Sequence, residues 1–185
     1  MKTESQNLQY LLERVAALLR GERRNLLGEH GLLPIQFEAL YFLGVCNRYS
    51  DTPMAVTEYL GQTKGTVSQT LKVLEKKGLI AKQKDETDKR LIHLNLTDAG
   101  RGLLEQHSHS ALLQHLPDTQ LAPLCEGLAQ LLIQMQRANG SRPFGQCRQC
   151  RFNQHLGGEA YFCNLTKEPL SESDTGLICR EFESW

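Results

Sequence analysis

Four cysteines near the end of the chain have the residue type and the spacing of a metal site. They occur as Cys147-x2-Cys150-x12-Cys163-x15-Cys179. A Cys-x-x-Cys pair places two thiolates on one tight turn, close enough together to bind a single metal centre. The segment that carries them, residues 144–185, is rich in polar residues and glycine, so it buries too little apolar area to fold unaided. The sequence therefore predicts a metal-binding module with these four cysteines as ligands.

The spacing leaves the bonding partner of the thiols open. Two disulfide bonds are the alternative in a secreted protein, but the first residues lack the apolar run of a signal peptide. No stretch approaches the ~20 apolar residues that span a bilayer, so we expect a cytoplasmic protein without a membrane partner. In that compartment clustered cysteines more often bind metal than form disulfides. Structural zinc with four thiolates usually has two Cys-x-x-Cys pairs, and here there is one.

One Cys-x-x-Cys pair followed by two separate cysteines resembles the cluster-binding spacing of high-potential iron proteins. The resemblance implies an iron–sulfur cluster, with a cubane [4Fe–4S] centre favoured and Zn²⁺ as the alternative cofactor. Aromatic side chains can shield such a cluster from water, and four of them are near: Phe152, Tyr161, Phe162 and Phe182. His155 could replace one cysteine ligand, although an exposed loop position is the simpler interpretation.

A second stretch of functional residue types runs from residue 61 to residue 96. Its first part predicts a short helix that begins after Thr63, whose hydroxyl can cap the first turn, and ends at Gly78. Beyond Gly78 the apolar period changes from 3.6 to 2, which predicts two strands joined by a polar tip at residues 85–90. Residues 61–96 are therefore predicted to form a helix followed by a hairpin.

The exposed residue types of this helix and hairpin suit nucleic acid. Hydroxyls and amides can address base edges in a major groove, ammonium groups can address phosphates, and arginine is drawn into a narrow minor groove. The candidate DNA-binding residues are Thr63, Lys64, Thr66, Ser68, Gln69, Lys72, Lys84, Lys89 and Arg90. Residues 64–93 hold eight Lys and Arg against four Asp and Glu, whereas the whole chain has 21 of each, so the positive charge is concentrated here.

The motifs TVSQTLKVLEKKGLI (66–80), DKR (88–90) and LNLTDAG (94–100) resemble the winged helix-turn-helix of MarR-type transcription factors. The resemblance covers about the first three quarters of the chain. It implies that residues 64–72 enter the major groove, that Arg90 reaches the minor groove, and that Asp88 braces the wing through an ion pair. It also implies a homodimer on a pseudo-palindromic double-stranded DNA site.

The spacing of apolar residues in the rest of residues 1–138 predicts the helices that position the DNA-binding helix and hairpin. A first helix covers residues 3–27, a second begins at Pro34, and a short one covers residues 54–60. Thr97 is expected to cap a helix that runs to about Leu116, with four leucines facing inward: Leu103, Leu104, Leu112 and Leu113. A long helix follows from Pro117, and its leucines at steps of three and four form a seam that predicts dimerisation with the first helix.

These predictions define a mainly α protein with two parts. Residues 1–138 form a MarR-like dimerisation and winged-helix domain, residues 139–143 a linker, and residues 144–185 a small irregular module held by metal. The leading hypothesis is a dimeric regulator whose iron–sulfur cluster senses redox state, oxygen or iron supply. The alternative keeps the regulator, with a structural zinc tail and a small-molecule effector. An enzyme is not expected, because no paired carboxylates, phosphate loop or activated nucleophile is recognisable. Cys46 and Cys125 are expected to be structural.

Overall fold

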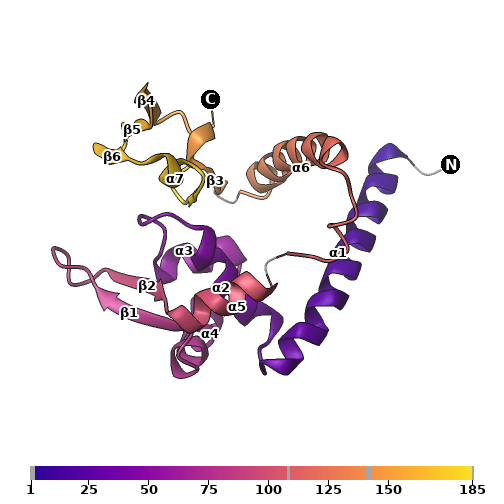
Figure 1. The fold of residues 1–185 in the computed structure, drawn as a ribbon, viewed down its shortest axis with the longest axis horizontal. Helices are drawn as coiled ribbons and strands as arrows, with labels where there is room; N and C mark the ends of the chain where they lie inside the picture. The colour runs from indigo at the N-terminus through magenta and orange to yellow at the C-terminus, as the bar shows by residue number, and fades with distance from the viewer. Residues whose placement is uncertain (1–2, 108, 141–142, 185) are drawn as a thin grey trace.

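The computed structural model describes residues 3–107, 109–140 and 143–184. Helices dominate the first part of the chain and short strands its end (Figure 1). The elements up to residue 138 are α1 (Glu4–Glu29), α2 (Pro34–Val45), α3 (Pro53–Leu60), α4 (Lys64–Lys76), β1 (Ile80–Lys84), β2 (Ile92–Leu96), α5 (Asp98–His107) and α6 (Asp118–Ala138). Those after residue 143 are β3 (Gly145–Gln146), a 3₁₀ turn η1 (Cys147–Gln149), β4 (Asn153–Gly157), β5 (Ala160–Cys163), β6 (Glu168–Leu170), α7 (Glu172–Thr175) and β7 (Ile178–Cys179).

The hydrophobic core lies among α2, α3, α4 and the β1–β2 ribbon. Its largest fully buried side chains come mainly from α2 and α4, and include Phe37, Leu40, Phe42, Val67 and Leu74. Thr52 caps α3, which begins one residue earlier than predicted, and the Thr63 hydroxyl accepts from the Thr66 N–H at 3.2 Å at the predicted start of α4. The turn between them ends α3 at Gly61, whose φ of 59° is the left-handed region that glycine favours. The expected winged helix-turn-helix is confirmed.

The ribbon after α4 is the wing. Gly78, with φ of 70°, turns the chain out of α4 into β1. The strands β1 and β2 pair antiparallel with Ile80 opposite Leu96 and Lys84 opposite Ile92. Leu94 on β2 is buried in the core, so one face of the ribbon is anchored while the tip extends away from the domain (Figure 1). The polar tip predicted at residues 85–90 lies between the two strands, as expected.

The helix after the wing is shorter than predicted. It ends at His107, and residues 111–115 form turns instead of a further helical stretch. The carboxylate of Glu22 on α1 accepts from the Ser110 hydroxyl at 2.5 Å and the Ala111 N–H at 2.8 Å, which holds this segment against α1. Leu112 and Leu113, expected to face inward on the helix, are 50% and 44% exposed, whereas Leu103 and Leu104 are buried. The prediction of a helix to Leu116 was wrong because a side-chain contact from a distant helix replaces the helical bonds.

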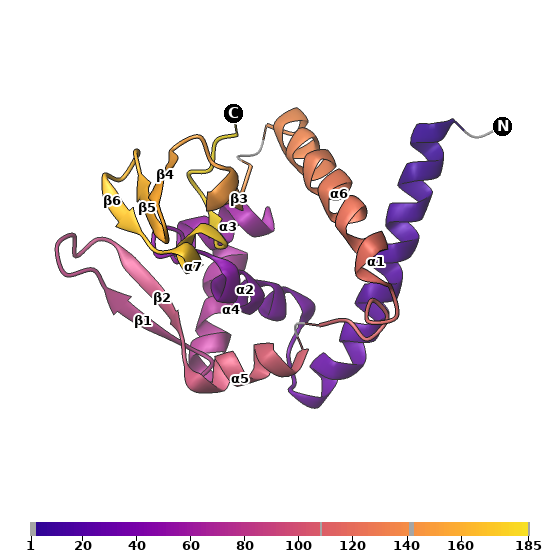
Figure 2. The ribbon, with the colours of Figure 1, turned by 45° about the horizontal axis from the view of Figure 1, so that its top comes forward.

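The helices α1 and α6 carry the predicted apolar seams on their surfaces. They diverge from one another as the two arms of a V (Figure 2). Large apolar residues of both remain exposed: Leu8, Leu11, Val15 and Leu18 on α1, and Leu124, Leu128, Leu132 and Met135 on α6. No residue of α6 is buried. Neither these nor the other described helices combine the length and apolarity needed to cross a membrane.

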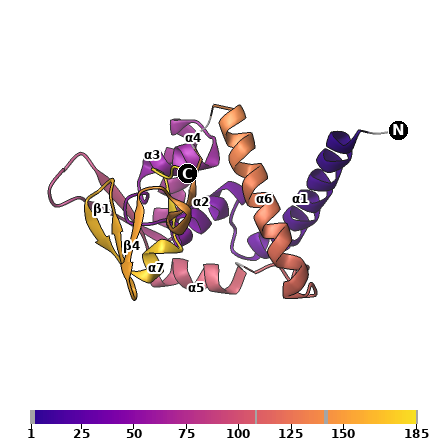
Figure 3. The ribbon, with the colours of Figure 1, turned by 90° about the horizontal axis from the view of Figure 1, so that it is seen from above.

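The C-terminal segment folds into two small antiparallel sheets, β3–β7 and β4–β5–β6. The predicted irregular module is therefore more regular than expected. It lies over α2 and α3, on the side away from α5 (Figures 1 and 2), and seen from above its strands overlie the wing (Figure 3). The predicted linker falls between the end of α6 and β3. Its residues Ser141 and Arg142, like Met1, Lys2, Ser108 and Trp185, lie outside the described residues.

Candidate nucleic-acid interface and candidate metal centre

The helix α4 presents one apolar face to the core and one polar face to solvent. Val67, Leu71 and Leu74 recur at helical spacing and are buried, and Thr70 joins them. The polar residues between them point outward, and all five predicted positions are exposed: Lys64, Thr66, Ser68, Gln69 and Lys72. Thr63 is exposed as well and begins the helix. The apolar spacing alone thus decides which side chains of α4 are available to a partner.

The wing lies beside α4 and brings further cations to the same part of the molecule. Lys82 on β1 donates to the carboxylate of Glu75 on α4 at 2.5 Å, which ties the two elements together. The predicted wing residues Lys84, Lys89 and Arg90 are all exposed. The structure therefore exposes all nine candidate DNA-binding residues on α4, its cap and the adjoining wing.

The tip of the wing is ordered by two aspartates. One carboxylate oxygen of Asp85 accepts from the Thr87 hydroxyl at 2.6 Å, the Asp88 N–H at 2.7 Å and the Thr87 N–H at 2.8 Å. These bonds hold the pKa of Asp85 well below its usual range. Asp88 accepts from the Arg90 guanidinium through both oxygens, at 3.1 and 3.2 Å, which is the brace that the resemblance implied. Because the Arg90 side chain is 91% exposed, this pair orients the guanidinium more than it stabilises the fold.

The four predicted ligands come from separate elements of the module and meet at one small enclosed cavity. Cys147 begins η1, Cys150 follows it, Cys163 ends β5 and Cys179 ends β7. All six cysteines of the chain are free, so the disulfide alternative is not what this structure contains. Burial, followed by the neighbouring thiols of Cys179, Cys150 and Cys163, raises the pKa of Cys147 to about 11. Four mutually repelling thiolates are stable together only beside a compensating positive charge.

The arrangement of the thiols bears on which group fits them. In the described ranges no three His, Cys, Asp or Glu side chains are grouped tightly enough to hold one metal ion. A tetrahedral zinc with bonds of about 2.3 Å needs sulfurs only about 3.8 Å apart. Four thiolates are the donor set of both a [4Fe–4S] cluster and structural zinc, so the residue types at this cavity fit either group.

The surroundings of the cavity are apolar, with one predicted shielding residue in place. Phe152, Leu165 and Leu170 line it together with the cysteines. Tyr161 instead stacks on His155, with ring centroids 4.7 Å apart, on the exposed β4–β5 hairpin. His155 also bonds the Gly158 carbonyl at 2.7 Å and does not line the cavity, so it is not a replacement ligand here. Phe162 and Phe182 are likewise absent from the lining, and Phe182 packs against Gly145.

Two asparagines beside the thiols were not identified from the sequence. The Asn153 amide donates to the Cys147 carbonyl at 3.1 Å and to its sulfur at 3.5 Å. Asn47, which precedes the module by about a hundred residues, bonds the Cys179 thiol and lowers its pKa against the larger effect of burial. Amide donors to sulfur stabilise negative charge on a thiolate. No sequence signal links Asn47 to Cys179, since only the docking of the module brings them together.

The module docks on the winged helix through the loop between α2 and α3. The Asn47 N–H donates to the Ile178 carbonyl at 2.9 Å, and the Arg180 N–H donates to the Ser50 hydroxyl at 2.9 Å. The Arg180 guanidinium binds both carboxylate oxygens of Glu58 on α3 at 2.6 and 2.7 Å. This attachment was missed by the sequence interpretation, which connected the module to the rest of the chain only through residues 139–143.

Aromatic packing and a surface ion pair extend the docking. Phe144 meets the rings of Phe42 and Tyr59 edge-on, at centroid distances of 5.7 and 5.3 Å. Arg48 bonds the Glu168 carboxylate at 3.2 Å and the Pro169 carbonyl at 2.9 Å. Cys46 forms an isolated β-bridge with Ile178 of the module and packs against the core, and burial raises the pKa of its thiol to about 12. Cys125 is exposed on α6, beside the exposed seam residues Leu124 and Leu128.

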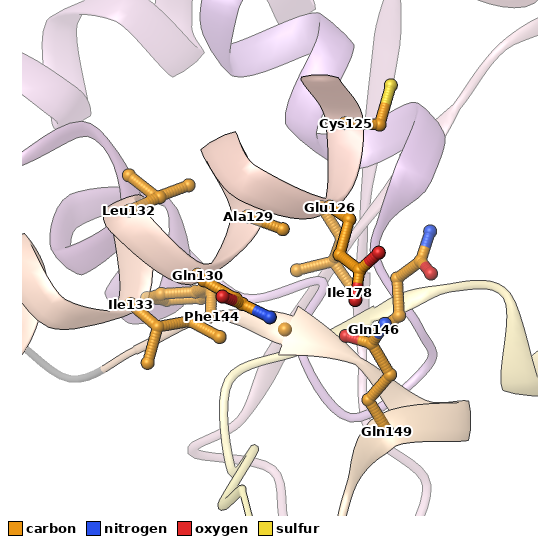
Figure 4. A pocket seen from close by; sticks show the side chains of 11 residues that line it. Cys125, Glu126, Ala129, Gln130, Leu132, Ile133, Phe144, Gln146, Gln149 and Ile178 are labelled. Carbon is orange, nitrogen blue, oxygen red and sulfur yellow. The ribbon is translucent and has the colours of Figure 1, made fainter. Parts of the chain in front are cut away.

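A groove of about 720 Å³ separates α6 from the module (Figure 4). Phe144 and Ile178 supply apolar surface, and Glu126 and Gln130 of α6 face Gln146 and Gln149 of the module across it. The sequence did not predict this groove, because its two sides lie on elements that the linker separates. Its mixed lining can accommodate a small amphipathic molecule.

Part of the chain matches the profile of a known protein family. Residues 30–91 match the profile of the MarR family, which covers about a third of the chain, from the end of α1 through most of the wing. Among proteins with curated functions, none matches this sequence.

Solved structures share the fold over a longer range. Streptococcus pneumoniae FabT in complex with DNA is 26% identical, with a TM-score of 0.57 over 74% of this chain and 99% of its own. A MepR mutant from a multidrug-resistant S. aureus clinical isolate is 23% identical, with a TM-score of 0.59 over 74% and 100%. CouR from Rhodococcus jostii RHA1 bound to p-coumaroyl-CoA is 21% identical, with a TM-score of 0.58 over 71% and 95%.

Proposed function

We propose that this chain, which carries the MarR-family profile at residues 30–91, is a homodimeric DNA-binding transcriptional regulator with an iron–sulfur cluster in its C-terminal module. The observation that carries DNA binding is the exposure of all nine predicted contact residues on α4, its cap and the wing. FabT, which shares the fold, has been solved on DNA. In this proposal the hydroxyl and amide groups of α4 read base edges, its lysines bind phosphates, and Arg90 enters the minor groove.

The dimer is supported by the two exposed seams. A winged helix places one α4 on DNA, and two copies are needed to read the halves of a pseudo-palindromic site. Large apolar residues are left exposed along both α1 and α6, and exposed apolar patches on a protein surface mark sites of association. Packing α1 and α6 of one protomer against those of its partner would bury them and fix the separation of the two α4 helices.

The cluster is supported by the convergence of Cys147, Cys150, Cys163 and Cys179 on one apolar cavity. When bound, a [4Fe–4S] cluster would supply a redox-active, oxygen-sensitive iron centre that the protein lacks otherwise. The chain's own residues supply thiolates, amide donors from Asn47 and Asn153, and a dry wall from Phe152 and Leu165. Because the module docks on the α2–α3 loop, gain or loss of the cluster can change the position of the DNA-binding elements. The signal in this proposal is redox state, oxygen or iron.

The DNA-binding proposal is tested with duplexes selected from a random pool by the full-length protein. Arg90→Ala and Lys72→Ala should each weaken binding, by about 1–3 kcal/mol for a base contact, and each lost phosphate contact should lower the salt slope by about 1. The matched control is Arg101→Ala, an exposed arginine on α5 outside the proposed surface. Equal affinities for all four proteins would overturn the assignment of α4 and the wing.

The metal proposal is tested on protein purified without oxygen. Iron and acid-labile sulfide near four per chain, with a broad absorbance near 400 nm, are expected for the cubane. Colourless protein with one zinc per chain would replace the cluster by the structural alternative. Iron-loaded and iron-free protein should then differ in affinity for the selected duplex, and equal affinities would remove the sensing role while leaving DNA binding intact.

A small-molecule effector is a second candidate, favoured by the groove between α6 and the module. CouR, which has the same fold, was solved with p-coumaroyl-CoA. A ligand lodged between Phe144 and α6 would change the angle of α6 and so the spacing of the two α4 helices. Replacing Gln130 by Trp should fill the groove and abolish any ligand-induced change in DNA affinity without changing the affinity of the ligand-free protein.

A further inference from the structure

The side chain of His93 joins the wing to the loop on which the cysteine module docks. His93 lies on β2, and its Nδ1 is 2.6 Å from a carboxylate oxygen of Asp51, in the α2–α3 loop. Its Nε2 is 3.1 Å from a carboxylate oxygen of Asp85, at the start of the wing tip. The side chains of His93, Asp51 and Asp85 are 22%, 17% and 25% exposed, so solvent reaches the bridge only in part. The sequence shows no pattern that pairs these residues, which are separated by 42 and 8 positions.

The Asp85 end of the bridge leads directly to the tip. One oxygen of Asp85 faces His93, and the other organises Thr87 and Asp88. Asp88 in turn holds the guanidinium of Arg90. The position of the candidate minor-groove arginine therefore depends on a carboxylate that His93 anchors.

The Asp51 end leads to the module. Asp51 follows Ser50, which accepts from the Arg180 N–H, and the same loop contributes the Asn47 N–H to Ile178. Its own carbonyl accepts from the Leu94 N–H at 2.7 Å, next to His93. One short loop, residues 47–51, thus contacts both the segment beside Cys179 and the base of the wing.

We infer that His93 is a positioning residue that, as an imidazolium, clamps the wing to the α2–α3 loop. Through this clamp, a change in how the cysteine module docks on the loop changes the position of Arg90. An imidazolium donates from both ring nitrogens, so it can satisfy Asp51 and Asp85 together. A neutral ring donates from one nitrogen only and turns a lone pair toward the other carboxylate. The link to the module rests on the proposed function, whereas the clamp itself does not.

The charges around the ring favour the clamped form. The hydrogen bond to Asp51 and then that to Asp85 raise the pKa of His93, against the opposing effect of burial. Burial raises the pKa of Asp51 and the bond from His93 opposes it, while Asp85 is held ionised by its hydrogen bonds. These two carboxylates are the charged groups that act on His93. A raised histidine pKa means that the clamp is complete below the ordinary value near 6.5 and is lost as the pH rises through the folded-state value.

Trypsin measures the clamp because Lys89 and Arg90 at the wing tip are its cleavage sites. At pH 6.5, trypsin should cut His93→Gln at these sites about tenfold faster than the natural protein. The reason is that losing one charged hydrogen bond shifts the opening equilibrium of the wing by about tenfold. At pH 9 the two should be cut at equal rates. Comparison at the same pH removes the pH dependence of the protease. His115→Gln, on the exposed segment before α6, is the matched control and should behave as the natural protein.

A second variant separates titration from a general loss of structure. Asp51→Asn keeps the side-chain volume and removes one charge, so the pKa of His93 from the ring resonances in an NMR titration should fall. The pH at which wing cleavage accelerates should fall with it. A pKa at or below 6.5 in the natural protein, or equal ratios of cleavage between His93→Gln and natural protein at both pH values, would overturn the clamp.

The link to the module is tested by loading the full chain with iron and sulfide. Removal of iron should raise wing cleavage in the natural protein about tenfold and should leave His93→Gln unchanged, because a broken clamp transmits nothing. If iron binds and changes DNA affinity while wing cleavage stays constant, the link fails and the proposed function stands. If the chain takes up no iron, the proposed cluster fails, and the pH comparison still decides whether His93 clamps the wing.

Discussion

The winged helix and the cysteine module reach a defined structure by different means. In the winged helix, Phe37, Leu40, Phe42 and Leu74 are each no more than 1% exposed and pack against one another. The described part of the module buries five apolar or cysteine residues, and two of the five are cysteines: Phe144, Cys147, Cys150, Leu170 and Phe182. Apolar burial can stabilise the first region, but not a segment with so little core.

The contrast indicates that the module depends on its surroundings. Its sheets have strands of two to five residues, which are too short to be stable alone. It is held by the Arg180–Glu58 pair, the aromatic contact at Phe144 and, in the proposed function, by a cluster on four thiolates. A region stabilised in this way responds to a chemical signal more readily than a close-packed core does. The difference between the two regions can be tested by removing each kind of support in turn.

The largest effect is expected for Cys150→Ser. Losing one of four ligands should abolish cluster binding and unfold the module, since metal binding and folding are coupled in such sites, with about 10 kcal/mol from a structural metal. Limited proteolysis should then remove residues 144–184 and leave a stable fragment ending near α6. Cys125→Ser, at an exposed position of α6, is the control and should keep the module resistant. A Cys150→Ser protein with a fully resistant module would show that thiol chemistry is not what holds it.

Leu74→Ala should destabilise the winged helix by about 2–5 kcal/mol, because a fully buried side chain leaves a cavity. Urea denaturation followed by circular dichroism measures the change. The matching variant in the module is Leu156→Ala, whose side chain is 58% exposed and should change stability by no more than about 0.5 kcal/mol. Similar losses for the two leucines would contradict the division between packed core and supported module.

The docking contact should have an intermediate effect. A double-mutant cycle on Glu58 and Arg180, each changed to Ala, should give a coupling energy of about 1–2 kcal/mol, since the pair is two-pronged and mostly shielded. The comparison pair is Arg151 and Glu183 within the module, whose side chains are 50% and 53% exposed. It should couple by less than about 1 kcal/mol. A coupling near zero for Glu58 and Arg180 would mean that the module is not held through α3.

The smallest effect is expected at the start of α4. Thr63→Ala removes the hydroxyl that accepts from the Thr66 N–H and should cost about 1 kcal/mol in thermal or urea unfolding. Thr63→Ser retains the oxygen and should cost far less. The module should stay docked in both variants, so its proteolysis should not change. Faster proteolysis of the module in Thr63→Ala would show that the two regions unfold together.

The helix α4 and the wing, at residues 61–96, were largely predictable because the sequence signals that define them are local. Thr63, Gly78 and the change of apolar period from 3.6 to 2 lie within one stretch, and each acts on residues a few positions away. The same locality explains the assignment of Cys147 and Cys150 as a pair. The helix predicted to Leu116 failed because the decisive contact comes from Glu22, about ninety residues earlier.

Hydrophobic period and capping residues act over one or two turns, so they were enough to predict the helix and hairpin at residues 61–96, the exposed residues on both, and the two apolar seams; the winged helix-turn-helix as a whole came from the resemblance of its motifs. Three further features became visible in the folded chain alone: the module docks on the α2–α3 loop, Asn47 reaches Cys179, and His93 lies between Asp51 and Asp85. These contacts join residues far apart in the chain. Their partners are set by how whole elements pack, which no local pattern encodes.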